Sequence, residues 1–252
     1  MNEALPSERR AGVMLPSVFA LVALTAFIGL GTWQVERKAW KEALILTLER
    51  RVSAPPVPLP TREQWPTLDS ARDEFRRVTF SAAFVPGEEA LVYASGSALR
   101  DDVSGPGYWV FAVARAPLVG SVVVNRGFVP EGRQDPESRA AGELNGPLTM
   151  VGAMRWPEPR GSFSPTDLPE RNLWFVRDQM AIAAAKGWGE VAPFFVELEG
   201  PTPPGGLPHP AALKPTLRNE HLQYAITWYG LAVVVSVMFA VWLHSRRRAD
   251  AI

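Results

Sequence analysis

The chain has 252 residues, and its 26 Lys and Arg side chains are balanced by 26 Asp and Glu, so the formal net charge is zero. It contains no cysteine, which excludes disulfide frameworks, thiolate zinc sites, thiol-based copper chaperones and covalent c-type haem attachment. The balanced charge and the lack of a long basic run leave no electrostatic footprint for nucleic-acid binding. The apolar residues, 47% of the chain, are unevenly distributed.

Two windows, 11–35 and 221–245, contain no Asp, Glu, Lys or Arg. At about 1.5 Å per helical residue, each is long enough to cross the roughly 30 Å hydrocarbon core of a bilayer. We therefore predict two transmembrane helices with these boundaries. A cleaved secretory signal is the alternative for the first window, and a buried core helix is the alternative for the second.

Arginines lie just outside both windows, namely Arg9 and Arg10 before the first and Arg246 to Arg248 after the second. Because positive residues favour the cytoplasmic side, tails 1–10 and 246–252 are expected to be cytoplasmic. Segment 36–220 is then expected on the opposite side of the membrane.

The N-terminal tail contains Glu3 and Glu8, which is not typical of a mitochondrial transit peptide. The simplest expectation is a bacterial inner-membrane protein with two spans and a periplasmic domain.

The first helix is expected to continue outward through residues 36–51 as an amphipathic helix and to end at the prolines of 55–60. One later helix is predicted after Asp178 as N-cap, ending at Lys186 and Gly187. Short runs rich in Val, Phe, Tyr or Thr predict strands at 75–84, 90–94, 108–114, 121–129, 148–154 and 193–198. The predicted class is a membrane protein of α+β type, in which two transmembrane helices flank an external antiparallel β-rich domain with one or two helices.

A hydrolase would need a base within reach of a nucleophile, and the chain has only three histidines, His209, His221 and His244. No nucleophile elbow, dinucleotide fingerprint or phosphate-binding loop is present. A membrane-anchored hydrolase is therefore the least supported hypothesis, and we expect a binding or assembly role rather than an enzyme.

His221 opens the second window and shares one helical face with Arg218, Trp228 and either Tyr224 or Ala225. Neutral imidazole is a common ligand of haem iron, aromatic rings pack on a porphyrin, and Arg pairs with propionates. The alternative is that these residues bind no cofactor, because histidine and aromatic residues are common at a membrane interface.

Small residues at the end of the first window, including Gly29 and Gly31, would allow another helix to approach closely. The second window is the most direct partner. Gln34 and Arg37 would then emerge near Arg218 and His221, because both helix ends lie at the same face of the bilayer.

Several motifs resemble the surfeit locus (Surf/Shy-type) family of cytochrome c oxidase assembly factors. The first window leads into Gly-Thr-Trp-Gln-Val-Glu-Arg-Lys-Ala-Trp-Lys at 31–41, and the second opens with His-Leu-Gln-Tyr-Ala-Ile-Thr-Trp at 221–228. Between them, 107–108, 125–130 and 172–178 are similar to interior motifs of the family. Two departures are Glu220, where the family has a second Asn, and Asp167-Leu-Pro, which replaces Asn-Asp-Pro.

This resemblance implies an assembly factor that binds haem a as transient cargo and assists its insertion into, or stabilisation in, subunit I of cytochrome c oxidase. Subunit I and the lipid bilayer are the implied partners, with haem A synthase as a further candidate. The alternative is a scaffold that stabilises an oxidase intermediate without touching the cofactor. The resemblance makes His221 the expected axial iron ligand. Arg37, Arg126 and Arg218 are more speculative propionate partners, and each could equally be a surface or structural arginine. The other residues expected around the haem are Tyr224, Trp228, Trp33 and Gln34.

Overall fold

The computed structural model describes residues 6–117, 119–214 and 219–249, and the chain divides into two compact units. The first, which we call the helix pair, comprises Met1–Ile45 and Arg218–Ile252. The second, which we call the β-domain, comprises Leu46–Leu217.

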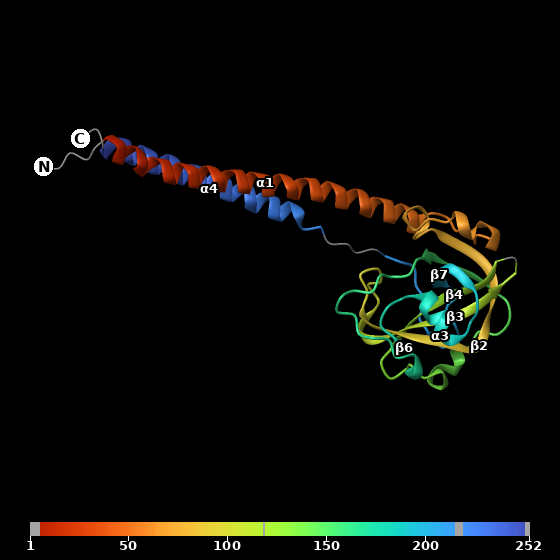
Figure 1. Ribbon diagram of the computed structural model, residues 1–252. Coiled ribbons are helices and arrows are strands. Elements are labelled where there is room, and N and C mark those ends of the chain that lie inside the picture. Colours follow the sequence, from red (N-terminus) through yellow and green to blue (C-terminus); the bar gives the residue numbers. More distant parts are fainter. Residues whose placement is uncertain (1–5, 118, 215–218, 250–252) are drawn as a thin grey trace. The chain divides into compact units, whose positions relative to one another are not determined.

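The helix pair is formed by α1 (Pro6–Ser53) and α4 (His221–Ala249), which lie side by side in Figure 1. Both helices are long and apolar enough to cross a membrane, and each contains one of the two uncharged windows. The chain is a two-span membrane protein of α+β class. As expected, α1 continues past the first window, and it ends at Ser53, just before the proline-rich segment. The β-domain, as a compact unit, begins at Leu46 inside this helix.

The strands of the β-domain form one sheet within the described residues. They are β1 (Val57–Pro58), β2 (Arg77–Gly96), β3 (Ser104–Ala116), β4 (Gly120–Pro130), β5 (Leu148–Arg155), β6 (Leu173–Trp174) and β7 (Val191–Gly200). The short helices are η1 (Arg62–Thr67), α2 (Ser70–Asp73), η2 (Pro136–Gly142), η3 (Pro169–Arg171) and α3 (Gln179–Lys186).

The sheet closes into a ring because β2 is long enough to pair with two different strands on successive parts of its length. Its first part, Arg77 to Ala82, pairs with β5, and its later part pairs with β3. The ring then continues from β3 through β4 and β7 back to β5. The predicted strands 75–84 and 90–94 are therefore one strand, in which the register with β3 shifts between Phe84 and Glu89.

The expected hairpin between 108–114 and 121–129 is confirmed as β3 and β4, which pair antiparallel. The sheet is not purely antiparallel, however, because β7 pairs parallel with β4 and β1 and β6 pair parallel with β2. A parallel pair needs a long crossover connection. The chain between β4 and β7, which includes β5 and α3, provides one.

Two hydrophobic clusters lie on opposite faces of this sheet, since neighbouring residues of a strand point to opposite sides. Val122, Val124 and Phe194 belong to one cluster, to which all five strands of the ring contribute. Val123 and Phe195 belong to the other, which is covered by Ile182 and Ala183 of α3. The first cluster fills the ring, and the second fixes the helix to its outside.

Helix α3 begins and ends where the sequence predicts. The Asp178 carboxylate accepts hydrogen bonds from the backbone N–H groups of Met180 and Ala181, and Gly187 ends the helix in the left-handed conformation. These local signals determine the ends of α3 independently of the sheet.

Candidate functional site

The helix pair brings together the two side chains that the family resemblance places at the ends of its spans. His221 is the first residue of α4, and its Nδ1 lies 2.6 Å from Oε1 of Gln34 on α1. Gln34 is only 9% exposed, and His221 is half-buried. The expectation that Gln34 emerges beside His221 is confirmed.

The contact is compatible with one tautomer of the neutral imidazole. An amide oxygen can only accept a hydrogen bond, so the two atoms form one when Nδ1 of His221 carries the hydrogen. In the neutral ring the other nitrogen, Nε2, then holds a lone pair. A neutral imidazole nitrogen of this kind is the usual histidine donor to haem iron.

Three contacts beside this hydrogen bond connect α1 to α4. The Tyr229 hydroxyl lies 3.1 Å from Oγ1 of Thr32. A Cβ added to Gly31 would come within 2.8 Å of the Tyr229 ring, so glycine makes room for that ring. One turn earlier, Phe27 stacks on Trp228 with ring centroids 5.8 Å apart. Gly29, in contrast, has no neighbour within 4 Å of such a Cβ, so only one of the two predicted small positions forms the contact.

The start of α4 is also connected to α1 through backbone groups. Nδ2 of Asn219 donates to the Lys38 carbonyl at 3.4 Å. The Glu220 carbonyl accepts from the N–H groups of Gln223 and Tyr224, so the family departure at this position lies at the helix N-terminus. The two residues just before His221 are therefore both hydrogen-bonded, Asn219 to α1 and Glu220 to the first turn of α4.

Of the remaining described site residues, Trp33, Arg37 and Tyr224 are exposed, and Trp228 is half-buried. Trp33 and Tyr224 are each 53% exposed, and the Arg37 guanidinium lies over the Trp40 ring at 4.0 Å. Of the two positions considered for one face of α4, Ala225 is buried and Tyr224 is exposed. The prediction for Arg218 falls outside the described residues.

The donor set fits a haem better than a bare metal ion. Within 6–117, 119–214 and 219–249, no three His, Asp or Glu side chains lie close enough together to hold a metal. A single imidazole is sufficient only where the iron already has other ligands, as it does in a porphyrin. Exposed aromatic rings at Trp33 and Tyr224 and the cation of Arg37 are suitable for a porphyrin face and a propionate.

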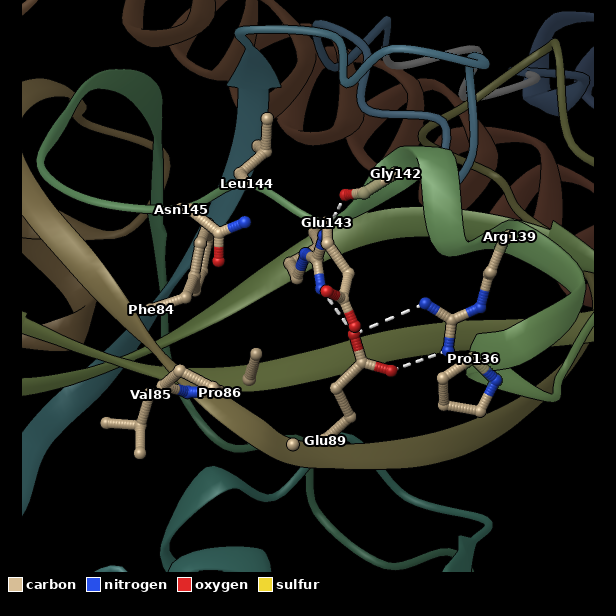
Figure 2. A pocket seen from close by; sticks show the side chains of 13 residues that line it. Phe84, Val85, Pro86, Glu89, Pro136, Arg139, Gly142, Glu143, Leu144 and Asn145 are labelled. Atoms are coloured by element: carbon tan, nitrogen blue, oxygen red, sulfur yellow. Dashed lines mark hydrogen bonds and ion pairs between the residues drawn. The ribbon is translucent and has the colours of Figure 1, made fainter.

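Arg126, one of the three speculative propionate partners, lies in the β-domain, where both of its terminal nitrogens have partners. It pairs with Glu89 and donates to the Gly142 carbonyl at 2.7 Å. Arg139 of η2 approaches the same carboxylate, with Nη1 at 3.2 Å from Oε1 (Figure 2). Burial lowers the pKa of the Arg126 guanidinium, against the opposing charge of Glu89. Glu89, Arg126 and Arg139 line a small pocket of about 70 Å³.

A family model for the SURF1 family matches residues 21–233. The chain belongs to the SURF1 family. Human Surfeit locus protein 1 is 36% identical over 94% of this chain and 80% of the human protein. The SURF1-like proteins of Monosiga brevicollis and Drosophila melanogaster are 35% and 32% identical, over 96% and 87% of this chain and 91% and 74% of their own lengths. The matched range contains both Gln34 and His221.

In this SURF1-family chain, the interior motifs at 125–130 and 172–178 build the β-domain. Nδ2 of Asn125 donates to the buried Glu197 carboxylate at 3.0 Å, and Arg177 reaches the same carboxylate at 3.4 Å. Burial opposes the charge of Arg177, but Glu197 and Glu158 hold the pKa of its guanidinium above the ordinary value. Trp174 is buried in the cluster under α3.

Sequence reasoning missed two groups of residues. Thr32 and Tyr229 extend the contact between α1 and α4, and the position of Thr32 directly after Gly31 was the available signal. The buried carboxylate of Glu197 was also missed. A charged residue inside the apolar run 191–198 marks it, because such a group must find a partner.

Proposed function

We propose that this SURF1-family protein is a membrane-anchored assembly factor for cytochrome c oxidase that binds haem a and assists its insertion into, or stabilisation in, subunit I. The observation that supports it is the hydrogen bond between His221 and Gln34, which leaves Nε2 of a half-buried imidazole as a potential iron ligand. Haem supplies the iron and the redox-active porphyrin. The chain binds, orients and shields it, and no bond-making step by the protein is required.

In this proposal, His221 coordinates the iron, and Trp33, Tyr224 and Trp228 offer apolar surface to the porphyrin. Arg37, three residues after Gln34 on α1, is proposed as a cation for a propionate, and Arg218 is proposed on the family resemblance alone. Arg126 is less suited to bind a propionate, because its guanidinium is buried and already paired with Glu89.

We further propose that both termini lie in the cytoplasm of a bacterium and that the β-domain lies in the periplasm. Three arginines, Arg246 to Arg248, follow the apolar part of α4, and positive residues are retained on the cytoplasmic side. The site then lies at the outer membrane–water boundary, where a hydrophobic haem tail can enter lipid. Subunit I, and haem A synthase as the donor, are the proposed partners.

The test is the absorption spectrum of the full-length protein purified after coexpression with haem a biosynthesis. We expect a bound haem spectrum in the wild type that is lost or shifted in His221→Ala. His209→Ala is the matched control, because His209 is about half exposed and lies in the β-domain. Its spectrum should match the wild type.

Two other results would contradict this proposal. Equal haem occupancy in wild type and His221→Ala, with oxidase assembly still dependent on the chain, would support a scaffold that does not touch the cofactor. Digestion of the β-domain by a protease added from the cytoplasmic side would refute the proposed topology.

A further inference from the structure

We infer that Gln34 is a positioning residue for His221: it fixes the imidazole with the hydrogen on Nδ1 and directs the Nε2 lone pair to the cofactor. The inference rests on the proposed haem-binding function and assigns Gln34 a role different from direct haem contact.

Gln34 is much less exposed to solvent than the predicted site residues near it on α1. It is 9% exposed, whereas Trp33 before it is 53% exposed and Arg37 one turn later is also exposed. A buried amide has little access to a bulky ligand, but it needs a hydrogen-bond partner. His221 supplies that partner at 2.6 Å.

The hydrogen bond also has a directional consequence. A free neutral imidazole exchanges between two tautomers, and only one of them leaves Nε2 without hydrogen. Because Oε1 of Gln34 accepts and never donates, it stabilises the tautomer with hydrogen on Nδ1. Partners of this kind orient metal-binding histidines in many proteins, and their loss typically lowers metal affinity by about 10–100-fold.

The approach of the two helices allows this contact. Gln34 lies one helical turn after Gly31, whose missing side chain leaves space for the Tyr229 ring. Asn219 holds the start of α4 to the Lys38 carbonyl, one turn beyond Gln34. Gln34 thus lies along α1 between two further contacts of the same helix pair.

The first measurement is the tautomer of His221 in the cofactor-free, full-length protein in lipid nanodiscs. In a His209→Gln, His244→Gln background, His221 is the only imidazole, so its two ¹⁵N signals need no further assignment. At about pH 8, we expect hydrogen on Nδ1 and an unprotonated Nε2. Gln34→Leu should shift the ring toward hydrogen on Nε2.

Two variants serve as controls. Gln34→Glu keeps an acceptor oxygen at the same place and should retain the tautomer. Gln223→Leu makes the same chemical change on an exposed glutamine two residues after His221, a spacing that does not share a helix face, and should leave both nitrogen signals unchanged. Far-UV circular dichroism of each variant establishes that the helices are intact.

The second measurement is titration of the same variants with ferric haem a. Gln34→Leu should weaken haem binding by about 10-fold or more. Gln34→Glu and Gln223→Leu should both bind haem as the wild type does. A wild-type ring with hydrogen on Nε2, or one unaffected by Gln34→Leu, overturns the inference whatever the haem result. A tautomer that shifts as expected while wild type and His221→Ala bind haem equally overturns the proposed function instead, and with it any role of Gln34 toward haem.

Discussion

Large apolar side chains are exposed on the helix pair and buried in the β-domain. Phe19 and Leu15 of α1 are 74% and 77% exposed, whereas Phe194 and Met154 of the β-domain are completely buried. The buried positions between the two helices are small or polar, as at Ala225, Ala232 and Gln34. Different forces therefore stabilise the two units.

The reason is the solvent that each unit faces. Lipid tails are as apolar as leucine, so burying leucine between membrane helices gains little, and close packing and polar contacts decide the association. In water, the β-domain gains roughly 25 cal/mol for each Å² of apolar surface that it buries. Substitutions in the β-domain should accordingly affect folding, and substitutions in the helix pair should affect the site.

The largest effect is expected from Phe194→Ala, in the cluster that fills the ring. Removing a fully buried Phe side chain should lower the unfolding free energy by about 3–5 kcal/mol. Urea unfolding of the full-length protein, followed by tryptophan fluorescence, measures it. Phe19→Ala is the matched control, and a comparable loss of β-domain stability in that variant would break the distinction between the units.

An intermediate effect is expected where the β-domain buries a charge. Arg100 is 1% exposed and its Nε donates to Asp102 at 2.7 Å, so Asp102→Asn should cost about 3 kcal/mol at neutral pH by leaving a buried cation unpaired. Asp101→Asn, at an exposed carboxylate 3.8 Å from Lys214, should cost less than about 1 kcal/mol.

The same pair predicts a pH dependence. The hydrogen bond from Arg100 holds the pKa of the Asp102 carboxyl below its ordinary value, so the contribution to stability is complete above about pH 3.9 and is lost as pH falls through the lower, folded-state pKa. The difference between wild type and Asp102→Asn should therefore shrink in acid. A difference that grows in acid would show that the pair does not act in this way.

The smallest effect on folding is expected from Gly31→Val, which should also disturb the hydrogen bond between Gln34 and His221. Its side chain would meet the Tyr229 ring, and overpacking of this kind costs about 1–3 kcal/mol. Thermal unfolding followed by far-UV circular dichroism, together with the His221 tautomer, measures the effect. Gly29→Val introduces the same residue with no neighbour within 4 Å, and equal effects of the two variants would rule out a specific helix contact at Gly31.

Local features of the fold were predictable because their causes lie within a few residues. The uncharged windows, the caps of α3 and the hairpin between β3 and β4 follow from neighbouring side chains. The closure of the ring was not predictable in this way. It depends on Arg77 to Ala82 finding β5, which lies more than 60 residues further along the chain.

For the candidate site, the sequence placed Gln34 and His221 at corresponding helix ends, because the length of an apolar helix is a local property. Only the tertiary structure decided that these two side chains, 187 residues apart, share a hydrogen bond, that Tyr224 is exposed, and that Arg126 is paired with Glu89. Which partner a polar group finds depends on the packing of the whole chain, since each buried donor or acceptor takes the nearest group that the fold brings to it.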